Sequence, residues 1–195
     1  AVIEAFLQGL EQLAAAGHPI DHLASVASFF VSRVDGKVDA ALDAQGNPGE
    51  LRGRAAIANA CEAYAAFERS LATPRWQALA AKGAHPQRPL WASTSTKDPA
   101  YPDTYYVEAL VAAQTVNTLP PATFDAYRDH GQPAIRIQDG MARSGADLAG
   151  LAARGIDLAT ITRTLEDEGV ASFAASFRTL LEGIERKAEV IGSRA

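Results

Sequence analysis

Two stretches of the sequence share one design, in which an apolar run passes directly into hydroxyl side chains and then a cation. The first is LASVASFFVSRVD at residues 23–35, and the second is PLWASTSTKD at residues 89–98. A short apolar run bounded by turn signals is typical of a strand buried in a parallel sheet. The carboxyl ends of parallel strands meet at one edge, where ligands of α/β proteins bind. Both stretches are therefore predicted to bring hydroxyl donors and a positive charge to one phosphate-binding rim.

The segments around these stretches predict a crossover connection. An alanine-rich helical pattern covers residues 50–71, and after Pro74 a shorter helix is expected over residues 75–82. An amphipathic helix without a capping residue is predicted over residues 1–15, as if the chain had been cut inside an element. Strand, helical crossover and strand together indicate a parallel sheet.

Further elements follow the second stretch. A third strand is predicted over residues 115–119, and Thr123 is expected to cap a short helix over residues 124–127. Two more helices are predicted over residues 144–154 and 157–191, the second kinked or divided at Gly169. Three strands do not close a barrel, and an eight-stranded barrel typically needs about 250 residues. A small open α/β sheet and the latter part of a (β/α)8 barrel both fit this pattern.

Composition narrows the class of function. The 195 residues are 48% hydrophobic, which is typical of a globular domain or part of one. The net charge of −5, without a block of Lys and Arg, argues against a nucleic-acid partner. No apolar run reaches the roughly 18 residues of a membrane span. The single Cys61 fits a reducing compartment, so we expect a cytoplasmic protein.

Three motifs resemble the later part of a bacterial transaldolase, and the resemblance covers nearly the whole chain. They are ASVASFFVSRVD, RPLWASTSTKDPAYPDTYYVEALVA and TVNTLPPATFDAYRDHG. The resemblance implies an α/β fold that is a partial (β/α)8 TIM barrel, with its last three strands, their helices and the C-terminal helices. Residues 1–195 are thus expected to be the C-terminal portion of a transaldolase-like barrel domain. Some relatives carry a fused phosphoglucose isomerase domain, and this chain is consistent with such a fusion.

The family resemblance also implies an activity. Transaldolases of the pentose phosphate pathway transfer a dihydroxyacetone unit between sugar phosphates through a lysine Schiff base. The implied substrates are fructose 6-phosphate, sedoheptulose 7-phosphate, erythrose 4-phosphate and glyceraldehyde 3-phosphate, and no cofactor, metal or membrane is implied. The family's Schiff-base lysine and its acid/base carboxylates lie on strands that would precede Ala1. We therefore expect this chain alone to be inactive, and to need the N-terminal half of the barrel as another chain or segment.

The family's binding roles map onto five residues. By resemblance, Ser28 lies beside the dihydroxyacetone adduct, Phe30 walls the pocket and Arg33 binds the substrate phosphate. Ser93 also contacts phosphate, and Lys97 supplies a charge where many transaldolases have an arginine shortly after that serine. Lys37, Lys82 and Lys187 are expected to be solvated, whereas Lys97 stands at the end of a strand within reach of a site. None of the four lysines is expected to form an imine.

Each of these five residues also has a structural interpretation. Arg33 could pair with Asp35 at the surface, and Ser28 could bond to its own backbone. Phe30 could be core, and Ser93 could belong to a strand end that reflects β-propensity alone. Lys97 could form an exposed ion pair with Asp98 worth under about 1 kcal/mol. The alternative to a transaldolase is a non-catalytic module that binds a phosphate ligand, or a structural fragment.

Other chemically distinctive side chains are expected to be structural. Cys61 has no base near it in the sequence and is predicted to be an inert buried thiol. The four histidines lack metal-ligand spacing. Four aromatic residues are expected to pack rather than to form a carbohydrate platform: Trp91, Tyr101, Tyr105 and Tyr106.

Overall fold

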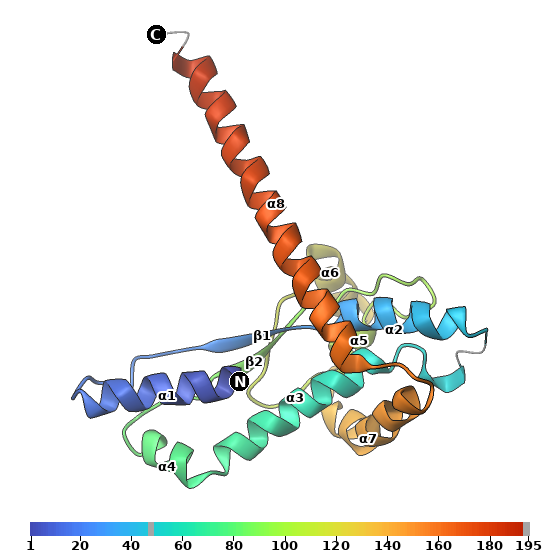
Figure 1. Cartoon of the computed structure of the whole chain (residues 1–195). Helices are drawn as coiled ribbons and strands as arrows, with labels where there is room; N and C mark the ends of the chain where they lie inside the picture. The colour runs from blue at the N-terminus through green and yellow to red at the C-terminus, as the bar shows by residue number, and fades with distance from the viewer. Residues whose placement is uncertain (47–48, 193–195) are drawn as a thin grey trace. The chain divides into compact units, whose positions relative to one another are not determined.

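The computed structural model describes residues 1–46 and 49–192 and divides into two compact units, residues 1–156 and a second unit that begins at Asp157 (Figure 1). The elements of the first unit are, in chain order, α1 (Val2–Ala15), β1 (Val26–Phe30), α2 (Ser32–Ala44), the 3-10 helix η1 (Gly49–Leu51), α3 (Ala55–Leu71), α4 (Pro74–Ala80), β2 (Arg88–Ala92), α5 (Tyr105–Ala109), β3 (Val116–Asn117), α6 (Pro121–His130) and α7 (Ile137–Ala153). The second unit is the helix α8 (Leu158–Gly192).

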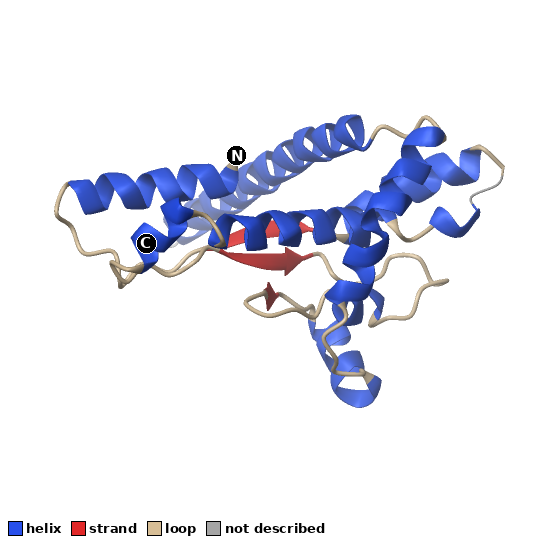
Figure 2. Ribbon diagram, turned by 90° about the horizontal axis from the view of Figure 1, so that it is seen from below, coloured by secondary structure: helices blue, strands red, loops and turns tan. Residues whose placement is uncertain are grey.

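The three strands form one parallel sheet in the order β1-β2-β3, drawn as red arrows in Figure 2. In this register Phe29 lies opposite Trp91, and their rings meet edge to face with centroids 5.8 Å apart. Trp91 is 1% exposed and donates from Nε1 to the carbonyl oxygen of Leu110 at 3.1 Å. The predicted α/β fold with a parallel sheet is confirmed, as is the packing role of Trp91.

The expectation that the first strand is buried on both faces is wrong. Side chains alternate across β1, and those of Val26, Ser28 and Phe30 are exposed. Val26 is 39% exposed and Phe30 is 41% exposed. Because successive side chains of a strand point to opposite faces, Phe29 is half-buried while the second face is open to solvent. Phe30 is therefore not a core residue of the described chain.

The first stretch also leaves the extended conformation earlier than predicted. Helix α2 begins at Ser32, one residue after the strand ends, and runs through Gly36. Its buried apolar residues Val34, Val38 and Leu42 recur every four positions, which is the helical period. Packing of this stripe outweighs the cost of a glycine inside the helix, about 1 kcal/mol.

Several other boundaries differ from the sequence prediction. Helix α3 begins at Ala55 rather than at residue 50, because Gly53 has a φ of +74° and interrupts the helical turn. Pro121 starts α6 with Pro120 at the cap position, so Thr123 lies inside this helix and its predicted capping role is wrong. Helix α7 begins seven residues before the predicted 144. Gly169 does not divide α8, which is continuous over 35 residues.

Helices α1 and α4 lie side by side in Figure 1 and share a core cluster. The cluster contains Leu7, Leu10, Ile20, Trp76, Leu79 and Ala84. At its edge the Arg75 guanidinium binds Glu11, with Nε 2.6 Å from Oε1. Among the described residues no helix is both long enough and apolar enough to cross a membrane.

Helices α3 and α7 approach closely at Gly140, and this contact yields a test of the fold. A Cβ atom added at Gly140 would lie 2.6 Å from Sγ of Cys61, which is fully buried. Gly140→Ala should lower the free energy of unfolding by about 1–3 kcal/mol, the usual cost of overpacking. Denaturant unfolding would measure this effect.

The same helix supplies the control. A Cβ atom at Gly145 would meet nothing within 4 Å. Gly145→Ala should raise stability by roughly 0.5–1 kcal/mol, because alanine is the better helix former. The double variant Cys61→Ala/Gly140→Ala should recover most of the loss. Equal effects of the two glycine substitutions would contradict this packing.

Candidate functional site

The carboxyl ends of the strands carry a row of hydroxyl groups. Beyond the ends of β1 and β2, the backbone ladder continues from Val31 N–H to the Ala92 oxygen at 2.9 Å and from Ser32 N–H to the Ser93 oxygen at 3.0 Å. The Oγ atoms of Ser32 and Ser93 are 3.0 Å apart. Thr94 Oγ1 donates to Asn117 Oδ1 at 2.8 Å, which joins the ends of β2 and β3. Hydroxyl groups thus lie at the ends of β1 and β2, and a side-chain amide lies at the end of β3.

Ser93 adopts a backbone conformation that non-glycine residues rarely have. Its φ is +56°, in the left-handed region that costs of order 1 kcal/mol or more for a side chain. The two contacts with Ser32 hold this conformation. It turns the chain out of β2 and keeps the Ser93 hydroxyl at the rim of the sheet.

Two cations stand at the same rim. The Arg33 guanidinium, in the first turn of α2, lies over the ring of Phe30 with its Cζ 4.7 Å from the ring centroid. Lys97 Nζ contacts Ser95 Oγ at 2.9 Å, and both cationic side chains are exposed. Ser28 lies two residues before Phe30 on the same open face of β1.

The predicted binding residues have separate local contacts, and Ser28 lies in the middle of β1 rather than at its end. Arg33 contacts Phe30, Ser93 contacts Ser32, and Lys97 contacts Ser95. Two structural interpretations from the sequence are wrong. Asp35 is 1% exposed and does not form a surface pair with Arg33, and the carboxylate of Asp98 binds Arg52 at 2.6 Å instead of Lys97.

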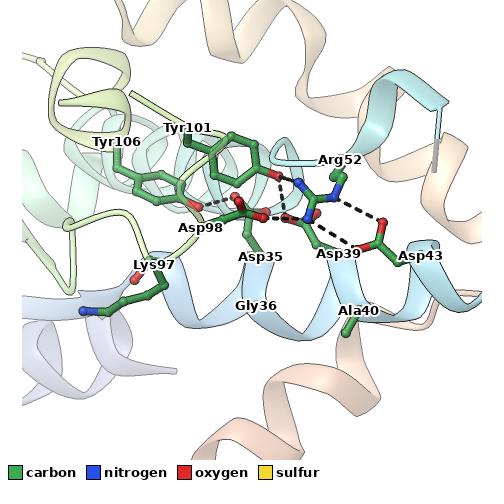
Figure 3. Close-up of a pocket in the computed structure, with 11 residues that line it drawn as sticks. Asp35, Gly36, Asp39, Ala40, Asp43, Arg52, Lys97, Asp98, Tyr101 and Tyr106 are labelled. Atoms are coloured by element: carbon green, nitrogen blue, oxygen red, sulfur yellow. Dashed lines mark hydrogen bonds and ion pairs between the residues drawn. The ribbon is translucent and has the colours of Figure 1, made fainter. Parts of the chain in front are cut away.

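A pocket adjoins this rim and extends along α2 (Figure 3). It is lined by Ser32 and Lys97, and further along by Asp43 and Arg52. In Figure 3 the Lys97 side chain lies apart from the network of carboxylates and tyrosines that lines the rest of the pocket. The pocket thus has a rim with hydroxyls and a cation, and a wall of hydrogen-bonded acidic residues.

Asp35 is the most buried carboxylate of this wall. Its Oδ1 accepts the Ala56 backbone N–H at 2.8 Å, and its Oδ2 accepts the Tyr106 hydroxyl at 2.8 Å. Burial raises the pKa of Asp35 to about 6, because desolvation disfavours the charged form more than these two hydrogen bonds favour it. Burial also raises the pKa of Tyr106, and the nearby Asp35 carboxylate adds to that effect.

Asp39 repeats the arrangement one helical turn later. Its Oδ1 accepts the Gly53 N–H at 2.9 Å, and its Oδ2 accepts the Tyr101 hydroxyl at 2.6 Å. Arg52 binds Asp98 at 2.6 Å and Asp43 at 3.2 Å. The hydrogen bond from the Ala100 backbone N–H lowers the pKa of Asp98 most, and the hydrogen bond from Arg52 lowers it further. These bonds tie the segment after β2 to α2.

Sequence reasoning missed the polar role of this network. The tyrosines were expected to pack rather than to bind carbohydrate, and the hydroxyl hydrogen bonds that Tyr101, Tyr105 and Tyr106 all donate were not predicted. The available signal was the spacing of Asp35 and Asp39, four residues apart on one helical face. It requires a helix that starts at residue 32, where the sequence analysis expected the end of a strand.

In the part of the chain that the structure describes, neither the thiol nor the possible metal ligands form a second site. Cys61 is fully buried, and burial raises the pKa of its thiol to about 11, so the predicted inert thiol is confirmed. Within residues 1–46 and 49–192, no group of three or more His, Cys, Asp and Glu side chains is placed to hold a metal ion.

Comparison with known proteins agrees with this architecture. The family model described as Transaldolase/Fructose-6-phosphate aldolase matches residues 3–184, and the chain belongs to this family. A transaldolase of Frankia alni is 54% identical over 192 residues, which cover 96% of this chain and 51% of that protein. A transaldolase of Parafrankia sp. is 52% identical, with 100% of this chain and 53% of that protein covered. The chain spans about half the length of the curated relatives it matches.

The buried Asp35 predicts a distinctive pH dependence of stability. Its pKa is about 6 in the folded chain, against 3.8 for an unperturbed aspartate, so the unfolded state loses its proton first as the pH rises. The free energy of unfolding should therefore fall between about pH 4 and pH 6, relative to Asp35→Asn, by up to roughly 3 kcal/mol. Above about pH 6 the difference should be constant.

Urea unfolding of wild type and variant across this pH range measures the difference. Asp139→Asn is the matched control, since Asp139 is exposed near the start of α7. That control should change the pH dependence by less than about 0.5 kcal/mol. A pH-independent difference between wild type and Asp35→Asn would show that Asp35 is not held in a desolvated state.

Proposed function

We propose that this chain forms the phosphate-binding part of a transaldolase, an enzyme that transfers a dihydroxyacetone unit between sugar phosphates. The proposal takes the reaction from the family to which the chain belongs. The substrates would be ketose and aldose phosphates of the pentose phosphate pathway, in the cytoplasm. In this role Arg33, Ser93 and Lys97 bind the phosphate, while Ser28 and Phe30 border the sugar.

The observation that carries the proposal is the common rim of β1 and β2. Ser93, with Ser32 beside it at 3.0 Å, lies between the segments that carry Arg33 and Lys97. The N-terminus of the 13-residue α2 adds the positive end of a helix dipole at this rim. Hydroxyl donors, two cations and a helix N-terminus match the chemistry of a phosphate dianion.

The cationic pair departs from the usual family pattern. Where many transaldolases have an arginine shortly after the strand serine, this chain has Thr94-Ser95-Thr96-Lys97. A lysine is a point charge on a flexible stem, whereas an arginine binds phosphate through two parallel N–H groups. We therefore assign the bidentate role to Arg33 and a weaker, charge-only role to Lys97.

We further propose that residues 1–195 are the C-terminal portion of a (β/α)8 barrel domain. The support is the open face of β1, where Val26 and Phe30 are 39% and 41% exposed. Apolar side chains of this size gain free energy when covered. The family's remaining strands, in another segment or another chain, would cover this face and close the sheet.

In this proposal, residues 1–195 bind the phosphate, and a lysine outside this chain performs the covalent chemistry. A lysine of the complete enzyme attacks the ketose carbonyl, water leaves, and the iminium accepts the electron pair released on retro-aldol cleavage. The resulting carbanion attacks the carbonyl of an aldose phosphate. A Schiff-base lysine needs an apolar pocket or a neighbouring cation. Lys82, Lys97 and Lys187 are exposed and lack such burial.

A hybrid enzyme tests the phosphate site. The hybrid joins this chain to the segment of the Frankia alni transaldolase that it does not span. Arg33→Ala should raise the KM for fructose 6-phosphate about 10- to 100-fold, the value of a charge-assisted contact to phosphate. Arg69→Ala, at an exposed arginine in the last turn of α3, is the control and should leave KM unchanged. An unchanged KM in Arg33→Ala would contradict the phosphate site.

Borohydride trapping in the same hybrid tests whether the Schiff-base lysine lies outside this chain. With fructose 6-phosphate, the reduced adduct should map to a lysine outside residues 1–195. An adduct on Lys97 would overturn the assignment of Lys97 to phosphate binding. If no adduct forms and the chain still binds phosphate, the non-catalytic binding module is the better description.

A further inference from the structure

Asp35 and Asp39 lie one turn apart on α2 and join the same two segments of the chain. Each carboxylate accepts one tyrosine hydroxyl from the segment after β2, at 2.8 Å for Tyr106 and 2.6 Å for Tyr101. Each also accepts one backbone N–H at the entrance to α3, from Ala56 at 2.8 Å or Gly53 at 2.9 Å. The duplication is visible in Figure 3 as two carboxylate–tyrosine pairs along one helix.

These pairs hold the segment that carries the proposed phosphate ligands. The segment leaves β2 at Ser93, which bonds to Ser32 on α2, and is fixed again at Tyr101 and Tyr106. Arg52 adds a fourth attachment through Asp98 at 2.6 Å. Lys97 lies between these attachments. The orientation of Ser93 and Lys97 relative to Arg33, in the first turn of α2, therefore depends on them.

We infer that Asp35 and Asp39 are positioning residues. Acting through Tyr106 and Tyr101, they hold Ser93 and Lys97 in the position relative to Arg33 that phosphate binding requires. The inference rests on the proposed function, because it assigns a role in that same site. None of these four residues touches the substrate in this account. They act by fixing the segment whose hydroxyl and cation do.

The chemistry of the pairs favours positioning over simple packing. Burial of a carboxylate is unfavourable, and apolar side chains of similar size often stabilise a fold better. Asp35 is 1% exposed and Asp39 is 6% exposed, so both are kept at this cost. A charged acceptor with a single hydroxyl donor fixes distance and direction, which an apolar contact does not.

Tyrosine variants of the hybrid enzyme test the inference, with inorganic phosphate as the probe. Tyr106→Phe and Tyr101→Phe each remove one hydroxyl and retain the ring. Each should raise the KM for fructose 6-phosphate and the competitive inhibition constant of inorganic phosphate about 3- to 10-fold, with kcat within about twofold. The double variant should raise both constants further.

A second buried tyrosine supplies the matched control. The Tyr64 hydroxyl donates to the backbone oxygen of Ala113 at 3.2 Å, outside residues 93–106. Tyr64→Phe also removes one tyrosine hydroxyl, here from a backbone carbonyl rather than a carboxylate, and should change neither constant. If all three tyrosine variants lower stability and leave both phosphate constants unchanged, the pairs are merely structural and the inference is wrong.

Comparing Arg33→Ala with the tyrosine variants distinguishes a failure of this inference from a failure of the proposed function. If Arg33→Ala weakens phosphate binding and the Tyr101 and Tyr106 variants do not, the inference fails and the phosphate site stands. If Arg33→Ala has no effect either, the site itself is wrong and both fail.

A binding measurement on the chain itself avoids any dependence on activity. Phosphate titration followed by NMR should show the amide signals of Arg33 and Ser93 saturating at higher phosphate in Tyr106→Phe, by about 3- to 10-fold. Saturation at the wild-type concentration would overturn the inference.

Discussion

The parallel register between β1 and β2 is the constraint on which the rest of the structure depends. It sets Phe29 against Trp91 in the core and carries the backbone ladder past the strand ends to Ser32 and Ser93. A slip of one residue would turn every side chain of one strand to the opposite face. The hydroxyl pair at the rim would then separate. Core packing and the proposed phosphate site are thus fixed by the same pairing.

The site adds a second requirement, because the segment after β2 must keep a fixed position relative to α2. Two faces of helix α2 provide this. Val34, Val38 and Leu42 pack into the core, while Asp35 and Asp39 hold Tyr106 and Tyr101. The face of β1 that carries Val26, Ser28 and Phe30 stays exposed to solvent. In the proposed barrel, that face becomes the interior.

Sequence patterns predicted the strands, their parallel order, most of the helices and the family, because these depend on local period and on short motifs. The start of α2 was missed because Ser32 and Arg33, which follow the strand-like run, were assigned to the end of the strand, and because Gly36 is unfavourable inside a helix. The carboxylate–tyrosine pairs were missed for another reason. They join residues 62 and 71 positions apart, and nothing in a local pattern of one chain specifies contacts over such separations. Side-chain identity at Ser93 likewise gave no sign of its left-handed backbone.

A crystal structure of the hybrid enzyme with fructose 6-phosphate trapped by reduction would test the central claim most directly. The account predicts the phosphate within hydrogen-bonding distance of the Arg33 guanidinium and the Ser93 hydroxyl, with Lys97 Nζ nearby and the reduced carbon–nitrogen bond on a lysine outside this chain. A phosphate bound elsewhere, with Arg33 still lying on the Phe30 ring, would contradict it.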